Sequence, residues 1–197
     1  RIREKIMRKP ADTSVDLHPV LAERWSSRAY DASATIGAED LTAILEAGRW
    51  APSAMNGQPW RFMVAHRGDK AFETIIGTLN GFNKVWTPNA IVFIAVLARM
   101  TNDDGSPRAT ALYDVGLAAA MMTVEGHLRG YNIHHMSGFD HDAFSSAFGL
   151  TSDLAPVAIL AVGKQVGPEA VANEAVRERE LAGRERLPLT ELVIQTH

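Results

Sequence analysis

The chain has 197 residues, of which 46% are hydrophobic, and this is enough for one globular domain with a full core. The net charge of −3 gives no basic excess that would favour a nucleic-acid partner. The absence of cysteine excludes disulfides, thiol nucleophiles and cysteine zinc sites.

The termini and the longest apolar run suggest no membrane segment. Residues 90–98 form that run, which is far short of the roughly 20 residues of a membrane-spanning helix. Residues 1–16 are polar and lack the apolar core of a signal peptide, so we expect a flexible leader on a cytoplasmic protein. Residues 17–197 are expected to form a single domain.

Hydrophobic periodicity predicts a mixture of helices and strands along the chain. We expect helices at 18–25, 38–48, 71–79, 108–129 and 140–148, and strands at 61–68, 90–98, 131–136, 156–164 and after Pro188. Residues 90–98 are apolar throughout and rich in β-branched side chains, which predicts a strand buried on both faces. Asp140 is expected to cap its helix, and Gly130 and Gly149 to end theirs. This order favours an α+β or α/β fold.

Two segments suggest contact with a second subunit. The predicted helix 108–129 is rich in alanine and glycine, which favours close approach to another backbone in a central or dimer-buried position. The tail from about 165 to 197 is polar and weakly periodic, so it would be hard to bury alone. It is expected to wrap over a partner.

Two pairs of arginines are spaced for anion binding. Arg24, Ser26 and Arg28 alternate, so in an extended segment they point the same way and could bind a phosphate. A solvated polar loop is the alternative. Arg184 and Arg186 are also two residues apart, within a charged tail where a solvated run is the usual interpretation.

A cluster of uncharged polar side chains lies between two prolines. Ser53, Asn56 and Gln58 stand between Pro52 and Pro59. Such side chains both donate and accept hydrogen bonds, which suits the edge of a flat heterocycle such as a flavin. Turn formation is the alternative, because serine, asparagine, glycine and proline are the common turn residues.

Metal and dinucleotide motifs are not evident. His134, His135 and His141 are close in sequence, but their spacing fits no zinc pattern and no metal is expected. Asp103 and Asp104 are interpreted as loop residues. The chain has no Gly-x-Gly-x-x-Gly or Walker-type loop, so a Rossmann nucleotide site is not supported.

The order of RWSSRAYD, APSAMNGQPWRF, HHMSGFD and GRERLPL resembles the nitroreductase family of FMN-dependent oxidoreductases, over roughly residues 18–192. The resemblance implies an α+β fold with a mostly antiparallel central sheet flanked by helices. It also implies an intertwined homodimer, with a C-terminal arm (about 165–197) that extends over the partner.

The resemblance implies an FMN site shared by two chains. Arg24 and Ser26 would hold the phosphate and ribityl chain, with Arg28 near N1 and the C2 carbonyl of the ring. The backbone N–H groups of Ser137 and Gly138 would approach flavin N5. The implied cofactor contacts are Arg24, Trp25, Ser26, Arg28, Pro52, Ser53, Ala54, Asn56, Gln58, Asn80, Met136, Ser137, Gly138, Arg184 and Arg186.

Some positions leave alternatives open. Asn80 matches an asparagine at the pyrimidine edge of the ring, although Asn83 or Lys84 could share that role. Phe82 and Trp86 could stack on an aromatic acceptor or belong to the core. Many relatives carry a proline and a glutamate where this chain has His135 and Ser137, which affects proton delivery and acceptor preference.

The implied activity is ping-pong hydride transfer. NAD(P)H would reduce the flavin, and an electron-poor small molecule such as a nitroaromatic or quinone would reoxidise it. The alternatives are a flavin-fragmenting or dehalogenating relative and an FMN-binding protein without turnover. The short segments 81–89 and 100–110 leave little room for the lid that the specialised enzymes need.

Overall fold

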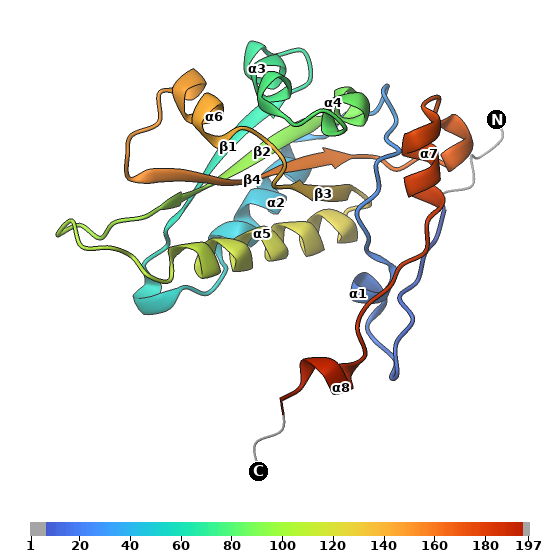
Figure 1. The fold of residues 1–197 in the computed structure, drawn as a ribbon, viewed down its shortest axis with the longest axis horizontal. Helices are drawn as coiled ribbons and strands as arrows, with labels where there is room; N and C mark the ends of the chain where they lie inside the picture. Colours follow the sequence, from blue (N-terminus) through green and yellow to red (C-terminus); the bar gives the residue numbers. More distant parts are fainter. Residues whose placement is uncertain (1–6, 195–197) are drawn as a thin grey trace.

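The computed structural model describes residues 7–194, which form a four-stranded sheet with helices on both faces (Figure 1). The strands are β1 Trp60–His66, β2 Val92–Arg99, β3 Asn132–Met136 and β4 Leu154–Gly163. They lie in the order β1-β2-β4-β3, and each neighbouring pair is antiparallel. The α+β class and the antiparallel sheet are therefore confirmed.

The two faces of the sheet carry separate apolar cores. One face is covered by α2 Ala38–Arg49 and α5 Ala111–Leu128. The other is covered by α3 Lys70–Thr78, α4 Asn83–Trp86 and α6 His141–Phe148. β2 is buried from Val92 to Ala98, as its apolar sequence predicts for a central strand. Among the described residues, no helix combines the length and apolarity needed to cross a membrane.

Local signals set the ends of the predicted helices. The Asp140 carboxylate accepts a hydrogen bond from Ala143 N at 2.9 Å, and Gly149 ends α6 in the left-handed conformation with φ 60°. Gly130 follows the end of α5 with φ 74°. Both helices end where the sequence predicts, because the caps satisfy backbone groups that the helix itself leaves free.

One face of α5 carries exposed apolar side chains. Leu112, Tyr113, Met121 and Leu128 are between 44% and 71% exposed. A Cβ on Gly116 would meet no atom within 4 Å. The opposite side of α5 packs against α2 and the sheet. This helix therefore carries apolar side chains on two sides, and a single chain covers only one of them.

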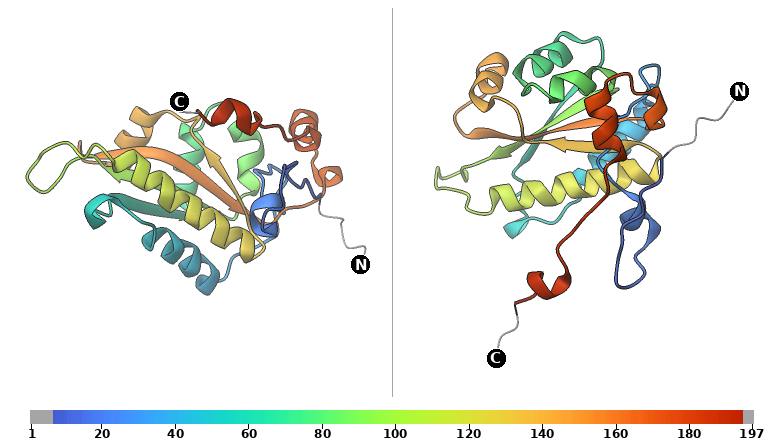
Figure 2. Two further views of the ribbon diagram at one scale, coloured as in Figure 1. Left: turned by 90° about the horizontal axis from the view of Figure 1, so that it is seen from below. Right: turned by 45° about the vertical axis from the view of Figure 1, so that its right-hand side comes forward.

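The tail differs from the prediction. The residues after Pro188 form a short helix, α8 Leu189–Leu192, so the predicted final strand is wrong within the described part of the chain. The tail also contains an unpredicted helix, α7 Glu174–Leu181, which Asn173 caps by accepting from Val176 N at 3.2 Å. Beyond α7 the chain leaves the body of the molecule (Figures 1 and 2).

The first described residues lie against this tail. Residues 7–16 contain no helix or strand, but Lys9 Nζ donates to Ala182 O at 2.7 Å. Ala11 N donates to Ala22 O at 2.8 Å, next to α1 Pro19–Glu23, and Arg184 Nη1 donates to the same carbonyl, also at 2.8 Å. Segments from both ends of the chain are thus held together.

Candidate functional site

A cationic pocket forms where the beginning and the end of the chain meet. In the segment after α1, Trp25 and Ser27 are buried, whereas Arg24, Ser26 and Arg28 alternate with them and reach the pocket. The cavity has a volume of about 280 Å³ and is lined by Lys9, Arg24, Trp25, Ser26, Arg28, Arg179, Ala182, Gly183, Arg184, Glu185 and Arg186. The structure thus brings together the two arginine pairs that the sequence singles out.

The positively charged side chains that line this pocket repel one another. Burial lowers the pKa of Arg24, and the charge of Arg186 lowers it further. The pKa of Arg184 is lowered by burial, then by Arg24 and Arg186. Burial likewise lowers the pKa of Lys9. The Nε atom of Arg28 is buried and has no hydrogen-bond partner among the described residues. An anion in the pocket would relieve this repulsion and supply acceptors.

A buried carboxylate supports the pocket from behind. Glu180 in α7 is fully buried and accepts hydrogen bonds from the Ser27 hydroxyl and, at 2.9 Å, from Arg28 N. Sequence reasoning missed Glu180, because it stands in a run of charged residues that is typical of a solvated segment. The hydrogen bonds tie α7 to the segment that carries the first arginine pair.

Two side chains of β3 hold the same segment. Asn132 accepts from Ser27 N at 3.1 Å and donates to Trp25 O at 2.8 Å. His134 Nδ1 lies 3.0 Å from Ser27 O, so this nitrogen carries the proton. Burial, assisted by the charge of Arg28, lowers the pKa of His134 to about 4. His134 is therefore neutral at pH 7 and acts as a fixed donor.

The segment between Pro52 and Pro59 forms a tight turn. Asn56 and Gln58 have positive φ angles of 53° and 44°. Gln58 N donates to Ser53 Oγ at 3.1 Å, and Gln58 Nε2 donates to Asn56 O at 3.1 Å. Turn formation therefore accounts for part of the polar character of this segment. The side chains of Asn56 and Gln58 remain exposed and available to a ligand.

The turn before β1 and the segment around α1, which leads into the cationic pocket, lie at opposite ends of α5 (Figure 1). Ala54 N donates to the Asp114 carboxylate in the first turn of this helix, at 3.3 Å. At the other end of the helix, burial lowers the pKa of His127, and the charge of Arg24 adds to this effect. A helix of 18 residues is about 27 Å long. The structure of one chain therefore does not bring the two predicted parts of the site together.

A third group of predicted residues gathers at the loop after β3. Asn80 N donates to Gly138 O at 2.9 Å, and Asn83 Nδ2 lies 3.3 Å from the same carbonyl. A Cβ on Gly138 would lie 3.3 Å from Asn83 Nδ2 and 3.5 Å from Asn80 Nδ2. Ser137 is exposed. Lys84 instead donates to Gly77 O at 2.9 Å, away from this loop.

Two predicted contact residues are core residues. Trp86 and Met136 are each 2% exposed and belong to the core between the sheet and α3, α4 and α6. Trp86 packs edge-on against Tyr30, with ring centroids 5.8 Å apart. In the single chain Trp86 therefore packs in the core, as one of its two interpretations expects, and the Met136 side chain has little exposed surface for contact with a flavin. Phe82 is partly exposed, and the Arg179 guanidinium lies 3.9 Å from its ring centre.

The three clustered histidines occupy different environments. His134 is buried in the network behind the pocket, whereas His135 Nε2 lies 2.6 Å from Thr123 Oγ1 on α5. His141 Nδ1 lies 2.9 Å from Pro156 O and its ring stacks on Phe139. Within residues 7–194 no group of three histidine, aspartate or glutamate side chains is arranged to hold a metal ion.

The fold and the pocket define an α+β protein with a cationic pocket beside an antiparallel sheet. The profile of the nitroreductase family matches residues 21–79. A crystal structure described as an oxidoreductase containing FMN is 30% identical, covers 94% of both chains and superposes with a TM-score of 0.87.

Curated relatives agree with that match. YdgI of Bacillus subtilis is 27% identical over 186 residues, which are 76% of this chain and 88% of YdgI. The major NAD(P)H-flavin oxidoreductase of Aliivibrio fischeri is 30% identical over 111 residues, 53% of this chain and 47% of that protein. The chain belongs to the nitroreductase family.

Proposed function

We propose that the protein is an FMN-dependent oxidoreductase that uses NAD(P)H to reduce electron-poor small molecules. The observation that carries this proposal is the cationic pocket, in which the pairs Arg24–Arg28 and Arg184–Arg186 line one cavity. A solved relative described as containing FMN, 30% identical and similar over 94% of both chains, supports the same cofactor.

The residues of the pocket fit the phosphate end of FMN. Arg24, Arg184 and Arg186 supply guanidiniums, which bind phosphate with paired donors, and the exposed Ser26 adds a hydroxyl. Arg28 would lie near N1 and the C2 carbonyl, where a cation stabilises the reduced ring. The Nε–H of Arg28 is buried and has no hydrogen-bond partner among the described residues, as expected of a donor whose acceptor belongs to the cofactor.

We propose that the complete site requires a homodimer. The exposed apolar face of α5 offers a surface for a second copy, and the exposed side chains Leu187, Leu189 and Leu192 leave the tail with apolar surface to cover. A two-fold partner packed antiparallel along α5 would bring its Asn56 and Gln58 beside the cationic pocket of the first chain. The turn would then form one wall of a shared flavin site.

Bound FMN would supply the hydride chemistry, accepting from NAD(P)H and passing to an acceptor such as a nitroaromatic or quinone. The chain would bind and orient the ring. The N–H groups of Ser137 and Gly138 would approach N5, and Asn80 lies beside them. Phe82, held under Arg179, is the remaining aromatic candidate for contact with the acceptor.

Loss of FMN from a double variant tests the phosphate assignment. Arg24→Ala combined with Arg184→Ala should purify colourless, because two charge-assisted contacts to the phosphate are lost. The control is Arg49→Ala combined with Arg177→Ala, which removes the same charge from arginines paired with Glu46 and Glu174. A pocket variant that keeps as much FMN as the control refutes the assignment.

Anaerobic mixing with NADH or NADPH tests turnover. Bleaching of the yellow absorbance, followed by its return when a quinone is added, is the expected result. A protein that holds FMN but is bleached by neither nucleotide would be a flavin-binding protein without this activity.

A further inference from the structure

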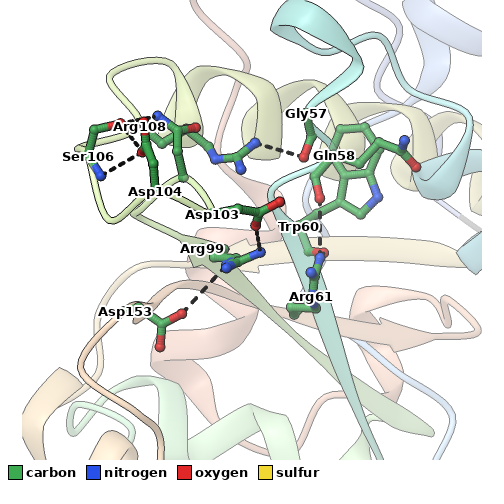
Figure 3. Close-up of polar contacts among 11 residues, drawn as sticks. Gly57, Gln58, Trp60, Arg61, Arg99, Asp103, Asp104, Ser106, Arg108 and Asp153 are labelled. Carbon is green, nitrogen blue, oxygen red and sulfur yellow. Dashed lines mark hydrogen bonds and ion pairs between the residues drawn. The ribbon is translucent and has the colours of Figure 1, made fainter.

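A second charged cluster lies at the other end of α5, around the loop that joins β2 to this helix (Figure 3). An open cavity of about 530 Å³ lies between this loop and the turn that follows Ser53. Its lining includes Gly57 from the turn and Asn102, Asp104 and Arg108 from the loop. The cavity therefore adjoins the turn that carries Asn56 and Gln58.

The carboxylates of this cluster already have partners. Asp103 pairs with Arg99 at 2.9 Å, and Arg99 Nε lies 3.6 Å from Asp153. Asp104 accepts from Ser106 Oγ at 2.6 Å and from Ser106 N at 2.9 Å, and these bonds lower its pKa. The acidic side chains thus hold the loop in place through these contacts.

The two arginines nearest the turn have no such partner. Arg108 Nη1 donates to Gly57 O at 2.7 Å, and its Nε is buried without a partner among the described residues (Figure 3). Arg61 Nη1 donates to the carbonyls of Trp60 and Gln58, at 2.7 and 3.2 Å. Neither guanidinium forms an ion pair within residues 7–194.

Arg108 is therefore placed to recognise an anion. A guanidinium has five N–H donors, of which the bond to Gly57 O occupies one and the buried Nε–H is another, so the remaining Nη donors are left for a ligand. The bond to Gly57 fixes the side chain across the cavity, so that little rotamer entropy remains to be lost on binding. Asp103 and Asp104 also line the cavity, but Asp103 is paired with Arg99 and Asp104 is hydrogen-bonded to Ser106, so within residues 7–194 Arg108 is the cation of this lining without an ion pair.

We propose that Arg108 binds an anionic group, a phosphate or a carboxylate, on the small molecule that reacts at the flavin. This inference rests on the proposed function, because that function places Asn56 and Gln58 against the flavin and so puts the cavity beside the reacting molecule. The anion belongs to the phosphates of the reductant or to a carboxylate on the acceptor.

The test compares charged and neutral substrates in wild-type protein and in Arg108→Gln, each saturated with FMN. The reductants are NADH and NADPH against uncharged N-benzyl-dihydronicotinamide, and the acceptors are para-nitrobenzoate against para-nitrobenzamide. Arg49→Ala is the control, because it removes an equal charge from a solvent-exposed pair with Glu46.

Arg108→Gln should lower kcat/KM for the anionic member of one pair about tenfold or more, through KM, and change the neutral member less than about twofold. Loss confined to NADH and NADPH assigns the site to the reductant, and loss confined to para-nitrobenzoate assigns it to the acceptor. Equal effects on charged and neutral members, or an equal effect of Arg49→Ala, overturn the proposal.

Wild-type protein gives a second measurement should the variant not fold. Rising ionic strength should lower kcat/KM for the anionic substrates and leave the neutral ones unchanged, because salt screens a charge–charge contact. Equal salt dependence of both overturns the inference. Protein that never retains FMN contradicts the proposed function instead, so the two failures are distinct.

Discussion

Replacing Glu180 by alanine tests the buried network behind the cationic pocket. The carboxylate is fully buried, and it accepts from the Ser27 hydroxyl and from Arg28 N at 2.9 Å. Glu180→Ala leaves both donors without this acceptor and removes the connection between α7 and the segment that carries Arg24. We expect a loss of stability together with weaker FMN binding.

The magnitude follows from the two donors. An unsatisfied buried donor costs about 1–3 kcal/mol. Ser27 is fully buried and should incur the full cost, whereas the N–H of the half-buried Arg28 can gain water. Removing a buried charge offsets part of the loss, because that charge no longer needs desolvation. We therefore expect Glu180→Ala to lower the free energy of unfolding by about 2–4 kcal/mol, and Glu180→Gln, which keeps one acceptor, by about 1 kcal/mol.

Urea unfolding at matched protein and FMN concentrations measures this difference, since bound ligand and subunit concentration both affect the midpoint. Glu178→Ala is the control, because Glu178 is exposed on the same helix and should change stability by less than about 0.5 kcal/mol. FMN fluorescence titration gives the affinity of each variant. If Glu180→Ala matches Glu178→Ala in both measurements, the network does not support the pocket.

Two further predictions concern His134 behind the pocket and the proposed sharing of the site between two chains. The pKa of His134 is about 4 in the folded protein, below its ordinary 6.5, so its stabilising contribution is complete above pH 6.5 and is lost as the pH falls towards 4. Over this range the shift lowers the free energy of unfolding by up to about 3 kcal/mol. His134→Gln should therefore flatten this part of the pH dependence of the urea midpoint. An unchanged slope would contradict the prediction. Separately, if the proposed dimer forms, mixing the Asn56→Ala and Arg28→Ala proteins should restore some activity after subunit exchange, and activity no higher than in the unmixed variants would argue for a site within one chain.

Much of the local structure could be predicted because local interactions determine it. Residues 90–98 are apolar on both sides of the strand, so only a central position in the sheet could bury them. Asp140 and Gly149 set the ends of α6 through contacts with residues close in sequence. The alternation of Arg24, Ser26 and Arg28 followed from the period of an extended chain.

The tertiary structure decided which distant residues meet. Arg184 reaches the pocket of Arg24 because the tail folds back along the first segment, and no periodicity in the sequence contains that path. Glu180 is buried because its partners come from another segment, while its own charged surroundings predict exposure. Hydrophobicity alone left Trp86 ambiguous, and packing placed it in the core. The sequence by itself determined the elements and the chemistry of the candidate side chains, and long-range packing, which depends on the whole chain path, determined which of them share a site.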